Sequence, residues 1–161
     1  GPVIDALAMA KDDGHICKLR VIGRDNPTPY QSQADRLGIS NLVSFEGPTR
    51  QIQEAYRSAD LFVFPSLYDP FANVVLESLA CGLPAITTTT NGSSEIINEN
   101  KDGYVIEGAT SHLASDIAQC ISKFCALSNE TRQQMRQHAR NTAEEYTIHR
   151  NTKQFIAHLS Q

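Results

Sequence analysis

The sequence lacks the features that mark several large classes of protein. It has no run of basic residues and a formal net charge of -4, which disfavours a nucleic-acid partner. No apolar run approaches the roughly 20 residues that a membrane-spanning helix needs. The first residues carry acids and no basic region of the kind that opens a signal peptide. We therefore expect a globular protein without a span or leader of its own.

Cysteine and histidine are present, but without the spacing that metal sites require. The four cysteines form no C-x-x-C motif, and no two of the five histidines are one helical turn apart. The pattern is also not that of a small disulfide-bonded domain. We expect four reduced thiols in a cytoplasmic protein, with no metal and no other cofactor. The cysteines are Cys17, Cys81, Cys120 and Cys125.

Two common catalytic motifs are also missing. The first apolar strand-like run is followed by GRDNPTPY, which lacks the G-x-G-x-x-G fingerprint of nicotinamide-binding domains. No G-x-S-x-G elbow is present, which disfavours a hydrolase of the Ser-His-Asp type. A dehydrogenase and a serine hydrolase are therefore both disfavoured.

What the sequence does contain is an alternation of short apolar runs and longer amphipathic segments. This order is typical of a parallel sheet with helices on both faces, and it predicts an α/β, Rossmann-like doubly wound domain. The single domain would cover residues 1–161, with a helical tail over about 144–161. We expect strands at 18–23, 42–47, 61–66, 84–90 and 103–107, and helices at 3–11, 28–38, 50–59, 70–80, 93–100, 111–126, 129–143 and about 147–159.

The first elements are in an unusual order for this fold. A doubly wound domain normally opens with a strand at the centre of the sheet, in the order 3-2-1-4-5-6. Here residues 3–11 predict a helix, so the five predicted strands count as the second to the sixth. We therefore expect the first strand to be missing, and strands 18–23 and 61–64 to remain unpaired with each other. Open edges of this kind favour a strand from a partner chain, or from the same molecule outside this numbering.

The segment DPFANVVLESLACGLPA (69–85) carries the strongest functional signal. It follows a predicted strand, so its start lies at the edge where open α/β sheets bind ligands. Asp69 and Pro70 predict the N-cap and first position of a helix. The free amides of the first turn, at Ala72, Asn73 and Val74, would form an anion site.

An acid later in the same helix adds to this signal. Glu77 lies beside the apolar face and is expected to be half enclosed, where its carboxylate can accept two hydrogen bonds from a diol such as ribose. The residues alone leave an alternative open. Asp69 is also explained as a simple helix cap, and Glu77 as a solvated or ion-paired surface residue.

The stretch SLYDPFANVVLESLACGLPAITT (66–88) resembles the C-terminal half of the GT-B glycosyltransferases of family 4, the group 1 transferases. Their fingerprint is Pro-Ser, then Glu-x-Phe-Gly, then Glu-Ala-x-Ala-x-Gly-x-Pro, and the similarity extends over about residues 1–125. VIGRDNPTPYQSQADRLG (21–38) is also similar to the lipopolysaccharide core glucosyltransferase branch. The matching positions are Pro65, Ser66, Asp69, Phe71, Ala72, Glu77, Ala80, Gly82 and Pro84.

The resemblance implies a donor site for a nucleotide-diphospho-sugar. By matching position, Glu77 would hold the ribose hydroxyls, and Asp69, the catalytic position, would face the transferred sugar. Backbone amides after Asp69 would contact the sugar and the diphosphate, and two loops after earlier strands would border the base and the cleft. The donor-binding residues implied in this way are Phe71, Ala72, Asn73 and Val74, then Gly23 and Arg24, and then Pro48, Thr49 and Arg50.

The resemblance also implies the reaction. A retaining enzyme would transfer a hexosyl group from a donor such as a UDP-sugar to a glycan or lipid-linked acceptor, in cell-envelope polysaccharide synthesis such as that of lipopolysaccharide. It would act in the cytoplasm, by peripheral association with the inner face of the membrane. The family's acceptor-binding N-terminal domain, and the Arg and Lys that neutralise the diphosphate, would precede Gly1. Residues 1–161 alone are therefore expected to transfer no sugar.

Two departures from the family pattern and two alternative functions remain. Asp69 stands where glutamate is usual, and Ala72 where glycine is usual, which leaves less room for close backbone approach. A sugar-nucleotide epimerase or phosphorylase of the same fold is one alternative. A non-catalytic module that binds a nucleotide or a partner is the other. Titration with nucleotide-sugars would show whether a diphosphate is bound at all.

Overall fold

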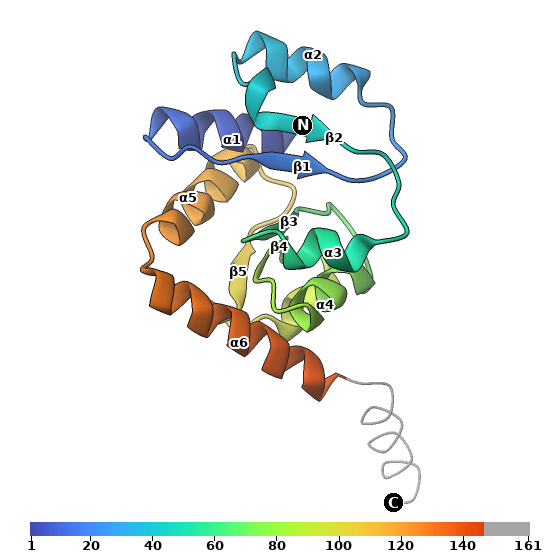
Figure 1. Ribbon diagram of the computed structural model, residues 1–161, viewed down its shortest axis with the longest axis vertical. Helices are drawn as coiled ribbons and strands as arrows, with labels where there is room; N and C mark the ends of the chain where they lie inside the picture. The colour runs from blue at the N-terminus through green and yellow to red at the C-terminus, as the bar shows by residue number, and fades with distance from the viewer. Residues whose placement is uncertain (147–161) are drawn as a thin grey trace, which may run out of the picture.

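Five short parallel strands form two separate sheets in the computed structural model, which describes residues 1–146 (Figure 1). One sheet pairs the first two strands, and the other has the order β3-β4-β5. The predicted α/β class and parallel pairing are confirmed, and each strand falls within its predicted range. The strands are β1 (Leu19–Val21), β2 (Val43–Phe45), β3 (Phe62–Phe64), β4 (Ala85–Thr88) and β5 (Gly103–Ile106).

Helices lie between successive strands, close to the predicted positions. The predicted helix at 93–100 is instead a short 3-10 helix, and the predicted helix at about 147–159 lies outside the described residues, as does most of the tail at 144–161. The helices are α1 (Pro2–Asp12), α2 (Thr28–Arg36), α3 (Ile52–Arg57), α4 (Asn73–Ala80), α5 (Leu113–Cys125) and α6 (Asn129–Glu145), with 3-10 helices η1 (Ser40–Leu42) and η2 (Gly92–Ile96).

Both faces of the larger sheet are covered. On one face, α5 packs over Ile86 of β4 and Tyr104 of β5, and α1 packs against α5. On the other face, α4 and α6 bury Val75 and Ala139 together with Ala85 of β4. This arrangement confirms the doubly wound architecture expected from the sequence.

The two sheets are joined mainly through α1. Ala6 and Ala10 of α1 belong to the apolar cluster of the larger sheet, and Leu7 belongs to the cluster that covers β1 and β2. Within the described residues β1 and β3 are not paired with each other. The two strands that would be neighbours in a continuous sheet therefore stand apart. No helix among residues 1–146 combines the length and the apolar character that a bilayer span requires.

Candidate functional site

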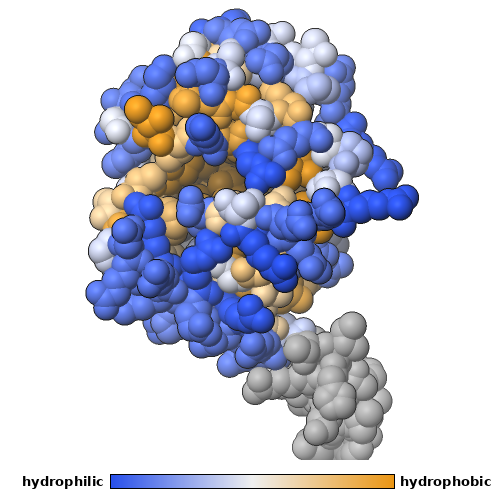
Figure 2. Space-filling model, in the orientation of Figure 1, coloured by the Kyte–Doolittle hydropathy of each residue, from blue (hydrophilic) through white to orange (hydrophobic). Residues whose placement is uncertain are grey.

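A cavity of about 1780 Å³ opens between the two sheets, which are called the two half-sheets below (Figure 2). At the carboxyl end of the strands, Gly23 lines one side of the cavity, and Val74 and Glu77 of α4 line the other. Parallel sheets bind ligands at this edge because the loops that follow the strands gather there. The structure therefore brings predicted residues from both half-sheets to one cavity.

Helix α4 starts later than the sequence indicated. Its N-cap is Ala72 and its first residue is Asn73, so Asp69 and Pro70 are not the cap and first helical position. The amides of Phe71 and Ala72 are occupied, since they donate to Asp69 Oδ1 (3.0 Å) and Asn91 Oδ1 (3.3 Å). Among the described residues, the amides of Asn73 and Val74 have no acceptor. The anion site predicted at this helix start would therefore be confined to these two N–H groups.

Asp69 is held in an extended loop that pairs with the segment after β4. Its N–H donates to the carbonyl of Thr90 (3.4 Å), and its carbonyl accepts from the N–H of Gly92 (2.9 Å). A Cβ on Gly92 would lie 1.9 Å from the carbonyl oxygen of Pro70. This pairing explains the late start of α4, because the carbonyl of Asp69 is bonded to Gly92 and does not accept the first hydrogen bond of the helix.

Asn91 is the buried centre of this pairing, and it was not selected as a site residue from the sequence. It is fully buried. Its Oδ1 accepts from the amides of Ala72 (3.3 Å) and Ser93 (3.0 Å), and its Nδ2 donates to Thr87 Oγ1 (3.0 Å). One side chain thus fixes the start of α4 relative to β4. The only local signal was an Asn-Gly pair directly after a strand.

Glu77 is exposed, whereas the sequence predicted a half-enclosed side chain. Its Oε2 lies 3.5 Å from the hydroxyl of Tyr56, a buried residue of α3 whose ring packs edge-on against Phe62. Burial, with the nearby charge of Glu77, raises the pKa of Tyr56 to about 12. Tyr56 therefore stays protonated and can orient the carboxylate. Tyr56 was not selected from the sequence, because its contact with Glu77 joins two different helices.

The predicted residues after β1 and β2 are exposed. Gly23 donates its N–H to the carbonyl of Gly47 (3.2 Å), which ties the two loops together, and Arg24 and Arg50 extend into solvent. Pro48 and Thr49 line a second cavity of about 450 Å³.

An ion pair that the sequence did not reveal lies between the two cavities. Arg20 pairs with Glu46 (2.7 Å) and also donates to Ser58 Oγ (2.8 Å), and it lines both cavities. The hydrogen bond from Arg20 lowers the pKa of Glu46. This pair fixes the wall between the large cavity and the smaller one.

The predicted residues do not all meet in one place. Within residues 1–146, Asp69, Phe71 and Ala72, on the loop before α4, line neither of these two cavities, and the same holds for Asn73, Arg24 and Arg50. No three His, Cys, Asp or Glu side chains in the same part of the chain gather as a metal site would require. A reaction without a metal or cofactor stays a prediction.

Comparison with known proteins identifies relatives over most of the chain. The family model "Glycosyl transferases group 1" matches residues 2–142. The D-inositol 3-phosphate glycosyltransferase of Thermomonospora curvata is 34% identical over 136 residues, which cover 80% of this chain and 30% of that protein. The lipopolysaccharide glucosyltransferase WaaG of Escherichia coli is 32% identical over 104 residues, covering 64% of this chain and 28% of that protein.

A solved structure agrees with these matches. The crystal structure of WaaG, a glycosyltransferase involved in lipopolysaccharide biosynthesis, superimposes with a TM-score of 0.81 at 26% identity, covering 91% of this chain and 39% of that one. The chain thus spans less than a third of the length of these two curated relatives.

Proposed function

This chain belongs to the group 1 glycosyltransferase family, and from that premise we propose that it binds the nucleotide-diphospho-sugar donor of a sugar transfer. The observation that carries the proposal is the grouping on α4 of two free amides, Asn73 and Val74, with the carboxylate of Glu77 one turn further along. The amides would hold the diphosphate, and the carboxylate would hold the ribose hydroxyls.

These groups would assist the transfer by electrostatic stabilisation. In the transfer, the bond between the anomeric carbon and the diphosphate oxygen breaks, a bond to the acceptor oxygen forms, and the acceptor hydroxyl gives up its proton to the departing phosphate oxygen. The nucleoside diphosphate leaves with added negative charge. The N-terminal amides of α4 lie at the positive end of the helix dipole and would stabilise that charge. No covalent intermediate on this chain is required.

Asp69 would contact the sugar. Its Oδ1 is engaged by the amide of Phe71, and its Oδ2 has no hydrogen-bond partner within the described residues. The free oxygen can accept a hydroxyl of the sugar. Since the proposed place of Asp69 is at the sugar end of the site, Asp69 would act on sugar discrimination rather than on nucleotide affinity.

The relatives also support a finer proposal. We propose hexosyl transfer by a retaining enzyme to a glycan or lipid-linked acceptor in the cell envelope, with UDP as the nucleotide. The glucosyltransferase activity in the name of WaaG supports a hexosyl donor and an envelope acceptor. A peripheral position at the cytoplasmic face of the membrane stays part of the same proposal.

The donor site is tested by calorimetric titration of UDP into the protein as its gene encodes it. Glu77→Ala should bind UDP about thirty- to hundredfold more weakly, because two charge-assisted hydrogen bonds worth about 2–3 kcal/mol are lost. The melting temperature should not change. Glu144→Ala, an exposed helix glutamate of α6, is the matched control and should keep full affinity.

Two outcomes would contradict the proposal. Unchanged affinity in folded Glu77→Ala would remove the role of Glu77. A wild-type protein that binds neither UDP nor another nucleoside diphosphate would favour a non-catalytic module that binds a partner.

A further inference from the structure

Two cysteines that are 108 positions apart in the chain lie in contact. The Sγ atoms of Cys17 and Cys125 are 3.5 Å apart, and both side chains are free thiols. In the part of the chain that the structure describes, Cys81 and Cys120 make no such contact. The fold therefore brings together one pair of thiols that their positions in the sequence did not relate.

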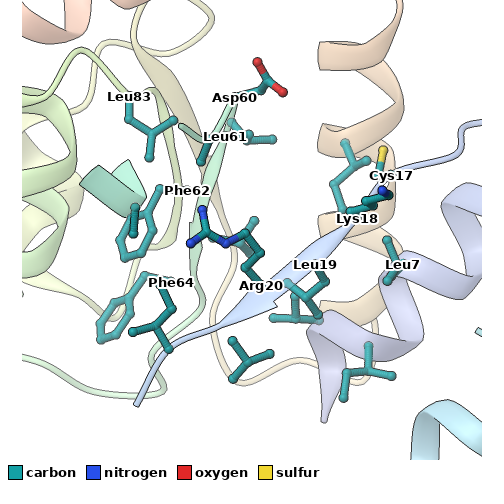
Figure 3. A pocket seen from close by; sticks show the side chains of 18 of the residues that line it. Leu7, Cys17, Lys18, Leu19, Arg20, Asp60, Leu61, Phe62, Phe64 and Leu83 are labelled. Atoms are coloured by element: carbon teal, nitrogen blue, oxygen red, sulfur yellow. The ribbon is translucent and has the colours of Figure 1, made fainter. Parts of the chain in front are cut away.

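The thiol pair lies at the edge of the fold where the strands begin. Cys17 belongs to the irregular segment between α1 and β1, and Cys125 is the last residue of α5. Figure 3 shows Cys17 at the entrance to β1, across the cavity from Leu61 and Phe62. The candidate donor site is at the carboxyl ends of the strands, so the thiol pair is separate from it.

Small molecules can reach both thiols. Cys17 and Cys125 are half-buried, line the large cavity and pack against the edge of the apolar cluster that covers the larger sheet. Cys120 belongs to the same cluster but is buried. The contact between Cys17 and Cys125 is therefore open to a reagent from solution, and Cys120 is shielded from it.

The two sulfur atoms are within reach of a covalent bond. A disulfide has a sulfur–sulfur distance of about 2.05 Å, so the two atoms would have to approach by about 1.5 Å. Rotation about the Cα–Cβ bonds and a small backbone shift can supply this movement. Such shifts cost least in loops and at helix ends, which are the positions of Cys17 and Cys125.

A cation lies beside the pair. Arg132 of α6 donates to the carbonyl of Cys125 (2.6 Å), and its guanidinium lies 5.1 Å from the centre of the Phe124 ring. Its Nε is buried and has no hydrogen-bond partner among residues 1–146. A positive charge beside a thiol favours the thiolate, which is the form that reacts with a disulfide. Arg132 therefore makes this a favourable place for thiol–disulfide exchange.

We propose that Cys17 and Cys125 are a modification site, at which a small disulfide such as oxidised glutathione forms a reversible bridge between them. The bridge would clamp the start of β1 to the end of α5, and so add a covalent link between two half-sheets that are otherwise joined mainly through α1. This inference does not depend on the donor-site proposal, because it rests on the thiol pair and its neighbours alone. A reversible bridge also agrees with the reduced thiols expected from the sequence, since disulfides of cytosolic proteins are transient.

The reaction consists of two exchanges. Burial, followed by the hydrogen bond with Cys125, raises the pKa of Cys17 to about 11, so Cys17 is the second thiol to react. The sulfur of Cys125 first attacks the small disulfide, whose S–S bond breaks and releases one small thiol. The sulfur of Cys17 then attacks the mixed disulfide on Cys125, and the second small thiol leaves. The two protein thiols are oxidised to one disulfide, the small disulfide is reduced to two thiols, and the two protons pass to these thiols through water.

Peptide mass mapping of the folded protein as its gene encodes it tests the bridge. After incubation with oxidised glutathione, alkylation and digestion, most of Cys17 and Cys125 should be recovered in one cross-linked pair of peptides that separates on reduction. Cys81 is the internal control, since it is also half-buried but has no sulfur neighbour among the described residues. It should be recovered alkylated or bound to glutathione. Recovery of Cys17 and Cys125 as single thiols, or a cross-link that forms only in urea, would overturn the proposal.

Thermal melting of the same samples tests the clamp. Oxidation should raise the melting temperature by about 5 °C or more, because a bridge across 108 positions restricts the unfolded chain. Cys125→Ser should abolish both the cross-link and the rise in melting temperature, and the matched variant Cys81→Ser should keep both. An equal rise in oxidised Cys125→Ser, or a bridge with no rise in the wild type, would contradict the clamp.

Discussion

The two sides of the candidate site are built differently. On the side of α4, the loop that carries Asp69 is fastened to the segment after β4 by backbone hydrogen bonds and by the buried side chain of Asn91. On the side of β1 and β2, Arg24 and Arg50 are exposed on loops whose described link is the bond from Gly23 to Gly47.

The difference indicates that the two sides would bind different parts of the donor. Preorganised groups stabilise charge without reorganising at the moment of reaction, so the fastened side suits the diphosphate and the ribose. Exposed loops are more mobile and tolerate variation, so the open side suits the base. Each prediction below compares one residue of the fastened side with a matched residue of the open side, or tests one side directly.

The largest effect is expected from Gly92→Ala. A new Cβ would lie 1.9 Å from the carbonyl oxygen of Pro70, and backbone on both sides would have to move. We expect a loss of more than about 3 kcal/mol in the free energy of unfolding, measured by denaturant titration. Gly23→Ala is the control, since its Cβ meets no atom within 4 Å, and it should change stability by less than about 0.5 kcal/mol. Equal stability of the two variants would contradict the comparison.

Asn91→Ala is expected to have the second-largest effect on stability. The substitution removes the acceptor of the Ala72 and Ser93 amides from a fully buried position. We expect a loss of about 2–3 kcal/mol in stability and a parallel loss of UDP affinity, because the start of α4 is released. Asn26 is the matched residue on the open side, where it accepts from the exposed amide of Thr28 (3.0 Å). Asn26→Ala should cost about 1 kcal/mol or less, and a similar cost for both would contradict the account.

The strands and the start of α4 show which features the sequence predicts and which it does not. Short apolar runs predicted all five strands, because burial on both faces of a parallel sheet leaves a continuous local pattern. Asp69-Pro70 predicted a helix start three residues too early. The cause is the pairing of Asp69 with Thr90 and Gly92, which are more than twenty positions away and leave no local signal.

The sequence also predicted only part of the surroundings of Glu77. Spacing along the helix placed it correctly beside the apolar face, but its exposure and its contact with Tyr56 depend on how α3 packs against α4. The separation of β1 and β3 was predicted from the order of elements, because residues 3–11 predict a helix where this fold usually has its first strand.

Tyr56→Phe is expected to have a moderate effect. The substitution removes the hydroxyl 3.5 Å from Glu77 and keeps the ring that packs against Phe62 at 5.5 Å. UDP affinity should fall about threefold, the cost of one weak neutral donor to a carboxylate, with little change in melting temperature. In the Glu77→Ala background the same substitution should have no effect on affinity. Equal losses in both backgrounds would show that Tyr56 does not act through Glu77.

The smallest effects are expected from Arg24→Ala and Arg50→Ala. Both side chains are exposed, so their attraction to a bound diphosphate is screened by solvent and salt. Each variant should weaken UDP binding by no more than about threefold at low salt, and by less at physiological salt. A tenfold loss that persists at high salt would mean that the open side closes over the nucleotide.

The central claim is that the start of α4 holds the diphosphate, and amide chemical shifts in the presence of ligand test it most directly. In a titration of the labelled protein with UDP, the resonances of Asn73 and Val74 should move most among the amides of residues 71–74, because the N–H groups of Phe71 and Ala72 are already bonded. Uridine, which lacks the diphosphate, should leave Asn73 and Val74 unmoved. Saturable UDP binding that shifts other amides and not these two would contradict the account.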